Sequence, residues 1–343
     1  MELSQRINSF SQLGDIIRVK LEGFNPNNFE NNHELWSLFD KARQKNPWFT
    51  AQNIKSSLTA IAEWLRTDVL HHWLSSYKIE KINPVQVGVI MAGNIPLVGF
   101  HDFLCVMMSG HSIAIKCSSD DDVLLPVLTE WLIAINPEWK NKIQFVNRLE
   151  KPGAVIATGS NNSARYFEYY FGKYPHIIRK NRNSVAVIDG FESKEDLVAL
   201  GDDIFSYFGL GCRNVSKLYI PEEYSLNTFF QCMEPYADVM NHNKYMNNYD
   251  YHHALFLLNN APFLTNNYLI VREHEALATP VSVLHYEYYK NESDLNEKLE
   301  NHKDEIQCIA GHRFIPFGKT QQPTLSDYAD GVDVMQFLID LKI

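Results

Sequence analysis

The sequence predicts an α/β fold with a parallel sheet, because short β-branched runs alternate along the chain with helical patterns. Residues 85–93 (VQVGVIMAG), 111–118 (HSIAIKCS) and 153–159 (GAVIATG) have the composition of strands, and helical patterns separate them. Strands that alternate with helices form parallel sheets that are covered on both faces. At 343 residues the chain is also long enough for two domains.

The elements follow in order from local patterns. Before residue 85 the pattern is helical, since Ile54, Leu58, Ile61 and Leu65 recur at spacings of three and four. In the first half, further helices are predicted at 99–110, 121–135 and 161–174, and further strands at 142–147, 176–180 and 184–190. In the second half, helices are predicted at 193–211, 225–240 and 293–307, and strands at 217–221, 268–274 and 282–289.

Two helix ends and one further segment can also be predicted. Gly110 is the expected end of the helix at 99–110, and Asn161 or Asn162 is the expected N-cap of the helix at 161–174. Residues 241–262 are polar and aromatic, and we expect a surface loop with a short helix there.

Charge and composition exclude several classes of function. The net charge of −10, from 31 basic and 41 acidic residues, argues against sequence-independent binding of nucleic acid. The N-terminus lacks the pattern of a signal peptide, and the most apolar stretch, 123–135, is too short to span a membrane. The five cysteines are scattered and odd in number, which does not suit a disulfide framework, so we expect a cytoplasmic protein.

The common dinucleotide and metal motifs are missing. The one GxG, Gly209-Leu-Gly211, has Asn214 where a third glycine belongs, and it follows a helix instead of a strand. The sequence contains neither GxxxxGK[ST] nor HExxH, and the adjacent His252 and His253 point to different faces of a regular element. No metal site is therefore predicted.

Three predicted strands nevertheless end in segments suited to a ligand. Asn94 lies in AGNIPLVGF after the first strand, and Lys116 lies at the end of the second. Thr158, Gly159 and Ser160 precede a helix whose N–H groups favour an anion such as pyrophosphate. Each segment alone is more often a cap or a solvated turn, but three consecutive strand ends of one sheet favour a binding site.

Residues 208–217, FGLGCRNVSK, place a thiol directly after two closely spaced glycines on a turn. A buried, unreactive Cys212 is the usual interpretation of such a residue. The neighbouring glycines make the sulfur accessible, which favours a nucleophile.

Five motifs occur in an order that resembles the aldehyde dehydrogenase superfamily. They are AGNIP, GHSIAIKCS, ATGS, GLGCRNVSKLYIP and RFIPFG, and together they cover roughly residues 85–330. The order looks most similar to the short acyl-CoA reductase branch, which is related to the fatty-acid reductase of bacterial luminescence. The resemblance implies an aldehyde dehydrogenase-like fold, with a Rossmann-like cofactor domain and a second α/β catalytic domain. The domains expected are 1–185, with N-terminal helices and the dinucleotide site, 186–320, with the catalytic cysteine, and a C-terminal segment, 321–343.

The resemblance also implies roles for residues. Cys212 matches the nucleophile that attacks a thioester carbonyl, and Asn94 matches the donor to the developing oxyanion. Lys116 matches the lysine that contacts the adenosine ribose or its 2′-phosphate, so NADPH or NADH is the expected cofactor. Glu275, before Thr279-Pro280-Val281, matches the glutamate that holds the nicotinamide ribose, at a spacing longer by one residue.

One departure from the family pattern bears on the reaction. Aldehyde-oxidising members carry a glutamate that activates water near the position of Ile178, but residues 176–188 contain no acid. A reductase needs its thioester to survive until hydride arrives, so the missing base favours acyl-CoA reduction. The expected substrate is an acyl thioester such as acyl-CoA, and a homodimer is possible. Two alternatives stay open: a cysteine acyltransferase or thioesterase without hydride transfer, and a catalytically silent binding protein.

Overall fold

The computed structural model describes residues 1–25, 33–79 and 83–341. Contacts divide the chain into two compact units, which we call unit 1 (Met1–Lys180 and Thr324–Ile343) and unit 2 (Asn181–Pro323). Compact units need not be domains that fold alone, so the predicted limits at 185 and 320 stay a prediction.

Unit 1 contains a parallel sheet in the order β3-β2-β1-β4-β5. Its strands are β1 (Gln86–Ile90), β2 (Ser112–Lys116), β3 (Ile143–Phe145), β4 (Ala154–Thr158) and β5 (His176–Arg179). Successive strands lie to one side of β1 and then to the other, so the chain order reverses between β1 and β4. This is the doubly wound arrangement of Rossmann-like folds.

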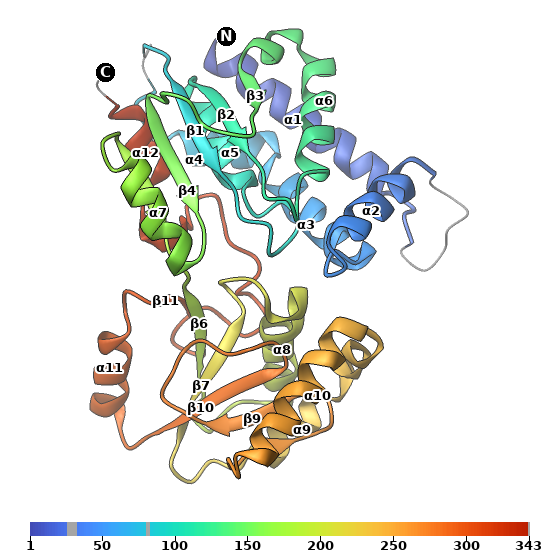
Figure 1. The fold of residues 1–343 in the computed structure, drawn as a ribbon, viewed down its shortest axis with the longest axis vertical. Coiled ribbons are helices and arrows are strands. Elements are labelled where there is room, and N and C mark those ends of the chain that lie inside the picture. Colours follow the sequence, from blue (N-terminus) through green and yellow to red (C-terminus); the bar gives the residue numbers. More distant parts are fainter. Residues whose placement is uncertain (26–32, 80–82, 342–343) are drawn as a thin grey trace. The chain divides into compact units, whose positions relative to one another are not determined.

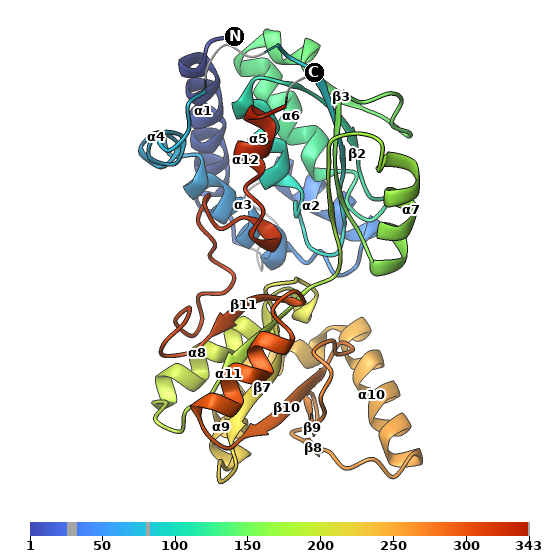
Figure 2. The same ribbon diagram turned by 90° about the vertical axis from the view of Figure 1, so that its left-hand side faces the viewer.

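Helices cover both faces of this sheet, with α7 on one face and α1, α5 and α12 on the other (Figures 1 and 2). Alternate strand residues supply the two interfaces: Val87 and Val89 join the large core below α5, and Ile90 joins the smaller core below α7. The helices are α1 (Leu3–Leu21), α2 (His33–Lys45), α3 (Ala51–Trp64), α4 (Thr67–Leu74), α5 (Phe100–Ser109), α6 (Leu124–Ile135), α7 (Asn161–Phe171) and α12 (Val334–Ile339), with short 3-10 turns η1 (Pro137–Asn141) and η4 (Ala329–Gly331). Gly110 ends α5 with a left-handed backbone (φ +96°), as predicted.

The C-terminal residues return to unit 1 and are held there by a chain of hydroxyl contacts. Trp73 Nε1 donates to the hydroxyl oxygen of Tyr328 at 2.9 Å. The hydroxyl groups of Tyr77 and Tyr328 lie 2.7 Å apart, and Tyr77 donates to Asp333 Oδ2 at 2.9 Å. Tyr328 therefore ties α4 to the segment that leads into α12.

Unit 2 contains a second sheet in the order β11-β6-β7-β10-β9-β8, parallel except for the pair β8 and β9. Helix α11 covers one face, and α8 and α9 cover the other (Figure 1). The strands are β6 (Asn183–Val187), β7 (Val215–Pro221), β8 (Leu264–Thr265), β9 (Ile270–Glu273), β10 (Val283–Tyr289) and β11 (Ile306–Ala310). The helices are α8 (Lys194–Phe205), α9 (Leu226–Cys232), α10 (Asn243–Leu258) and α11 (Glu292–Asn301), with 3-10 turns η2 (Ser206–Gly209) and η3 (Glu234–Asn241).

Two expectations for unit 2 are wrong. The segment expected to be mainly a loop contains a continuous helix, α10, because Tyr249 and Phe256 bury one side of it against β9 and β10. The helix expected at 293–307 ends at Asn301, and its last residues begin strand β11, which pairs with β6. In both places a long-range contact overrides the local pattern.

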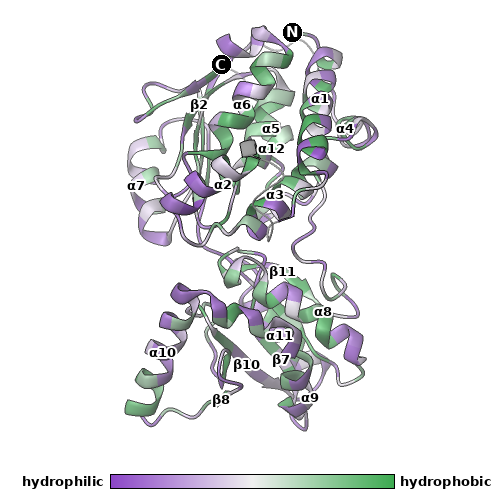
Figure 3. Cartoon of the chain, turned by 90° about the vertical axis from the view of Figure 1, so that its right-hand side faces the viewer, coloured by the Kyte–Doolittle hydropathy of each residue, from purple (hydrophilic) through white to green (hydrophobic). Residues whose placement is uncertain are grey.

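Hydropathy follows this layering. Helices α5 and α6 are predominantly hydrophobic, whereas α7 and α10 are largely polar (Figure 3). Among the described residues, no helix combines the length and the apolar character needed to cross a membrane.

Replacing Tyr328 tests the hydroxyl contacts of the C-terminal return. In Tyr328→Phe the buried Trp73 Nε1 loses its acceptor, so we expect the free energy of unfolding to fall by about 1–3 kcal/mol. Denaturant unfolding followed by tryptophan fluorescence measures the change. Tyr169→Phe is the matched control, because that ring is 82% exposed, and it should change stability by less than about 0.5 kcal/mol. Equal effects of the two changes would contradict this account.

Candidate active site

In unit 1, the predicted oxyanion donor Asn94 and the residues predicted to bind a dinucleotide lie at the carboxyl ends of adjacent strands. Asn94 follows β1, Lys116 ends β2, and Gly159 follows β4. Strands β2, β1 and β4 are neighbours in the sheet. In open α/β sheets, ligands bind outside the carboxyl ends of the strands where the chain order reverses, which here is between β1 and β4. The three segments therefore share the sheet edge at which ligand binding is expected.

Backbone contacts fix the loop that carries Asn94. Leu97 has a left-handed backbone (φ +58°), and its N–H donates to Asp121 Oδ2 at 2.7 Å. The carbonyl of Gly93 accepts a hydrogen bond from Asn46 Nδ2 at 3.2 Å. The loop is thus held on two sides, while Asn94 itself is exposed.

The turn after β4 is capped by Ser160, so the expected cap at Asn161 or Asn162 is wrong. Ser160 has an extended backbone, and its Oγ accepts a hydrogen bond from the N–H of Ser163 at 3.2 Å. A Cβ on Gly159 would lie 2.9 Å from atoms of α7, so the turn is too close to the helix for a side chain. The first N–H groups of a helix lack intrahelical acceptors, and this close turn places the strand end against them.

A buried ion pair that the sequence did not reveal supports the same edge. Arg179, the last residue of β5, donates to both carboxylate oxygens of Asp102 in the first turn of α5, at 2.6 and 2.9 Å. Arg179 Nη1 also lies 3.4 Å from Thr158 Oγ1. The partners are 77 positions apart, so no local pattern signals the pair. The Thr158 hydroxyl therefore accepts a hydrogen bond from Arg179 in this structure. Its predicted contact with a cofactor stays a prediction.

In unit 2, Cys212 lies on an exposed turn between η2 and β7. Three residues that lead into the turn, Tyr207, Phe208 and Gly209, have positive φ angles of 51°, 59° and 77°. A left-handed backbone costs roughly 1–2 kcal/mol for a residue with a Cβ. Such strain persists only where surrounding contacts impose it, and it is concentrated at functional sites.

Asn214, which stands where a dinucleotide motif would have glycine, supplies those contacts. Its Nδ2 donates to the carbonyl oxygens of Asp203 at 3.1 Å and Ser206 at 2.8 Å. Its Oδ1 accepts from the N–H of Gly211 at 2.8 Å. Asn214 is itself buried, so one side chain joins the end of α8 to the residue before the cysteine.

The segment after β11 packs beside the cysteine turn. Arg213 Nε donates to the carbonyl of Thr320 at 2.5 Å. The carboxylate of Asp203 accepts hydrogen bonds from the N–H groups of Gly318 and Thr320 at 2.7 and 2.9 Å. Gly318, the last residue of the RFIPFG motif, has a φ of +77°, a left-handed conformation that glycine adopts without strain.

Cys308 lies on strand β11 and has a side-chain partner on β6. Its Sγ lies 3.0 Å from Ser184 Oγ on β6. The same Oγ donates to the carbonyl of Cys212 at 2.9 Å. Cys105 and Cys232 are buried, as expected of packing residues.

A buried lysine holds the loop that carries Glu275. Lys217 on β7 is fully buried, and its Nζ donates to the carbonyl of Glu275 at 2.6 Å and to Glu287 Oε2 at 2.5 Å. Glu287 is shared with Lys298 through its other oxygen at 2.5 Å. The loop joins β9 and β10, parallel neighbours with only residues 274–282 between them. The side chain of Glu275 is exposed, and its contact with a ribose stays a prediction.

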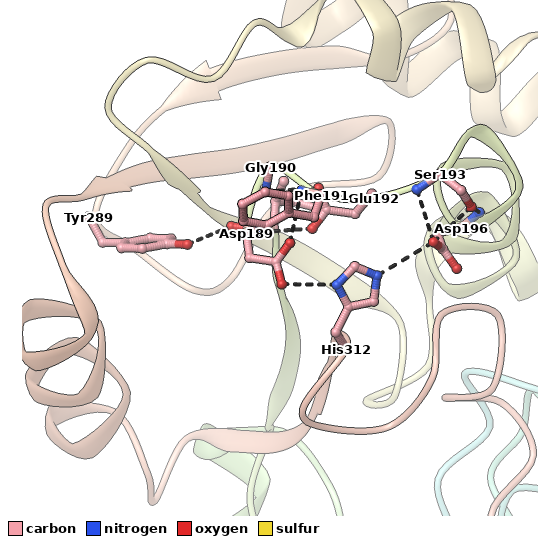
Figure 4. A network of polar contacts seen from close by, with 9 residues as sticks. Asp189, Gly190, Phe191, Glu192, Ser193, Asp196, Tyr289 and His312 are labelled. Atoms are coloured by element: carbon pink, nitrogen blue, oxygen red, sulfur yellow. Dashed lines mark hydrogen bonds and ion pairs between the residues drawn. The ribbon is translucent and has the colours of Figure 1, made fainter.

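A polar network at the end of β6 fixes His312, which follows β11 (Figure 4). His312 bridges Asp189 Oδ2 at 2.9 Å and Asp196 Oδ2 at 3.5 Å. The hydrogen bond with Asp189 raises the pKa of His312 above its ordinary value. Glu192 accepts from the N–H groups of Asp189 and Gly190 at 2.6 and 3.0 Å.

Asp189, Glu192 and His312 lie close enough together to hold a metal ion. Both oxygens of Glu192 already accept backbone hydrogen bonds, and Asp189 already accepts from His312. These hydrogen bonds anchor the segment after β11 without a metal ion, so we assign no metal to the three residues.

Comparison with known proteins identifies the fold. No family model and no curated protein sequence matches the chain. Among solved structures, the NAD+ complex of an aldehyde dehydrogenase from Bacillus cereus is similar at a TM-score of 0.60 and 12% identity, covering 90% of this chain and 72% of that one. A cysteine-to-alanine mutant of aldehyde dehydrogenase C from Pseudomonas syringae, complexed with NAD+ and octanal, has a TM-score of 0.64 at 10% identity, with coverages of 90% and 72%. Glyceraldehyde-3-phosphate dehydrogenase GapN from Methanocaldococcus jannaschii, complexed with NADP, has a TM-score of 0.61 at 12% identity, with coverages of 90% and 76%. The predicted aldehyde dehydrogenase-like α/β fold is thereby confirmed.

The exposure of Cys212 predicts selective alkylation. Burial raises the pKa of Cys117 to about 11 and that of Cys105 well above its ordinary value, so few thiolates form at these two positions. At pH 8, iodoacetamide should modify Cys212 at least about tenfold faster than these two thiols. Peptide mass mapping of briefly labelled native protein gives the rates, and Cys212→Ala should lose most of the early label. Preferential labelling of Cys105 or Cys117 would contradict the assignment.

Asp121, which holds Leu97, predicts a pH dependence of stability. Burial raises the pKa of Asp121 to about 7, partly offset by the Leu97 N–H. Its Oδ1 is buried without a hydrogen-bond partner in the described part of the chain. An unfolded aspartate has a pKa of about 3.9, so between about pH 4 and pH 7 the folded state binds more protons. This group therefore lowers the free energy of unfolding as pH rises through that range, by up to about 1.4 kcal/mol per pH unit.

Asp121→Asn tests this dependence because asparagine keeps an acceptor for Leu97 and cannot titrate. Denaturant midpoints measured from pH 4 to 7 should fall less steeply in the variant than in the wild type. Asp120→Asn, at an exposed neighbouring position, is the control and should keep the wild-type slope. An unchanged slope in Asp121→Asn would show that Asp121 is not the titrating group.

Proposed function

We propose that this protein is an NAD(P)H-dependent acyl-CoA reductase that forms an acyl thioester at Cys212 and releases an aldehyde. The observation that carries the proposal is the exposed Cys212, held on a strained turn by Asn214, in an aldehyde dehydrogenase-like fold. The similar structure that contains octanal is a cysteine-to-alanine mutant, which agrees with chemistry at a cysteine. The free thiols of the described residues suit a reducing compartment such as the cytoplasm.

The residues of unit 1 fit a nicotinamide dinucleotide. Gly159 and Ser160 offer a turn without a side chain at the N-terminus of α7, where a pyrophosphate is favoured. The ammonium group of half-buried Lys116 has no hydrogen-bond or ion-pair partner among residues 1–25, 33–79 and 83–341. A cation left unpaired at a strand end suits a ribose hydroxyl or a 2′-phosphate. The loop of Glu275, held by Lys217, is proposed to contact the second ribose.

Acylation follows from the properties of Cys212 and Asn94. The thiolate of Cys212 attacks the thioester carbonyl, the carbon–sulfur bond to CoA breaks, and CoA leaves as a thiolate that takes up a proton. Asn94 donates its side-chain amide to the oxygen that becomes negative during the attack. Loss of one such donor typically lowers the rate by about 10²–10³.

Reduction requires that the acyl enzyme outlast hydrolysis. When bound, a reduced nicotinamide would supply a hydride to the carbonyl carbon of the thioester, which leaves the thiohemiacetal at Cys212 as its oxyanion. The carbon–sulfur bond of that thiohemiacetal then breaks, which releases the aldehyde and restores the Cys212 thiolate. Residues 176–188 contain no acid to activate water, and the carboxylate of Asp102, which lies beside the end of β5, is paired with Arg179. Both features support reduction over hydrolysis.

Intact mass spectrometry with a series of acyl-CoA thioesters tests the proposal. The wild type should gain the mass of one acyl group, and Cys212→Ala should gain none. Addition of NADPH or NADH should remove the adduct and yield an equivalent of aldehyde. Asn94→Ala should acylate about 10²–10³ times more slowly, and Cys117→Ala should acylate at the wild-type rate.

Two results would favour the alternatives. An adduct that is hydrolysed or transferred without oxidation of the nicotinamide indicates a thioesterase or acyltransferase. No adduct with any chain length indicates a binding protein.

A further inference from the structure

Unit 1 contains a cavity of about 300 Å³ that the proposed reaction does not use. Its lining includes Gly110, His111 and Lys142. Gly110 and His111 directly precede β2, and Lys142 directly precedes β3. The cavity therefore lies at the amino ends of the strands, opposite the edge that carries Lys116. It is a separate site within the same unit.

The side chain of Arg6 on α1 also lines the cavity, and its charge is not neutralised locally. Arg6 is only 9% exposed, yet its side chain makes no hydrogen bond or ion pair with any residue that the structure describes. The nearest acid, Glu2, is exposed and acts on Arg6 only through space. Burial lowers the pKa of Arg6, and Glu2 partly opposes that effect.

The backbone of Gly110 makes room for this guanidinium. A Cβ on Gly110 would lie 2.1 Å from Arg6 Nη1, so any other residue there would displace the side chain. Arg6 Nη1 thus lies against the turn between α5 and β2, and the side chain forms part of the cavity wall.

Other donors in the wall point to the same kind of ligand. Lys142 is half-buried, and among the described residues its Nζ reaches only the carbonyl of Gly110, at 3.5 Å. His111 adds no charge, because its Nδ1 accepts from Val85 N–H at 3.1 Å and its Nε2 donates to the carbonyl of Leu338 at 3.0 Å. The wall therefore contains two side-chain cations, Arg6 and Lys142, and one exposed carboxylate, that of Glu2.

An unpaired buried charge costs several kcal/mol, and the usual remedy is a partner of opposite sign. The chain carries a net charge of −10, but among the described residues no acid forms an ion pair with Arg6; the exposed Glu2 lines the same cavity and acts on Arg6 only through space. A phosphate group carries about −1.5 to −2 charges at pH 7, which matches Arg6 and Lys142 together. The guanidinium fork suits phosphate oxygens, and the cavity volume is at the small end of ligand pockets.

We propose that this cavity binds a small phosphate-bearing molecule through Arg6 and Lys142. The inference does not depend on acyl-CoA reduction, since the residues involved lie at the opposite end of the sheet. A phosphate group bound in the cavity pairs with the Arg6 guanidinium and thereby stabilises the junction of α1 with α5 and β2.

Phosphate binding to the full-length protein tests the proposal. Inorganic phosphate is titrated at constant ionic strength against a chloride reference, and binding is followed by calorimetry and by the midpoint of thermal unfolding. The wild type should bind saturably and unfold at a higher temperature in phosphate. Arg6→Met and Lys142→Gln should each weaken binding at least about tenfold, because each removes a charged hydrogen bond. Lys140→Gln, at an exposed position two residues away, should bind like the wild type.

A second comparison separates binding from a structural role of Arg6. Without phosphate, Arg6→Met should be at least as stable as the wild type, since the change removes an unpaired buried charge. Loss of stability in Arg6→Met together with unchanged phosphate affinity would overturn the proposal. If Arg6→Met does not fold, the phosphate affinity of Lys142→Gln tests the proposal, and an unchanged affinity would overturn it. Equal responses to phosphate and chloride, or equal affinity for acetate, would also overturn it.

Discussion

The buried carboxylate of Asp203 holds the backbone around the candidate nucleophile. It is fully buried and accepts hydrogen bonds from the N–H groups of Gly318 and Thr320 and from the hydroxyl of Thr320. Burial raises the pKa of Asp203, and these donors oppose the increase by favouring the charged form. The carbonyl of Thr320 then accepts from Arg213, next to the cysteine. A contact between α8 and the segment after β11 thereby sets the position of the turn that follows α8, although the segment after β11 lies about a hundred residues further along the chain.

This arrangement explains why a thiol can lie on so bare a turn. Gly209 and Gly211, which both precede the cysteine, have no side chains to pack, so the turn is held through Arg213 and Asn214, which follow it. The restraint acts on backbone groups and leaves the Cys212 side chain exposed. It also maintains the positive φ angles of Tyr207 and Phe208, which a free loop would relax. Rigid support for an accessible sulfur is what nucleophilic catalysis requires.

The sequence predicts what depends on local periodicity and fails where distant pairing decides. The strands before Asn94, Lys116 and Thr158 were recognisable because each is a compact β-branched run that ends in small or polar residues. Strand β11 was not, since its conformation comes from pairing with β6, more than a hundred residues earlier. The ion pair of Arg179 with Asp102 was not recognisable either, because it forms only when strand β5 and helix α5 pack together. The cavity beside Arg6 likewise depends on contacts between separate elements.

The central claim is that Cys212 and Asn94 serve one reaction. A crystal structure of the protein with bound NADPH measures this directly, through the distances from Cys212 Sγ and Asn94 Nδ2 to the nicotinamide C4. The account predicts that sulfur and amide converge on one point beside that carbon, with room for a carbonyl group between them. A cysteine directed away from the nicotinamide, or an asparagine too far to reach the same carbonyl oxygen, would contradict it.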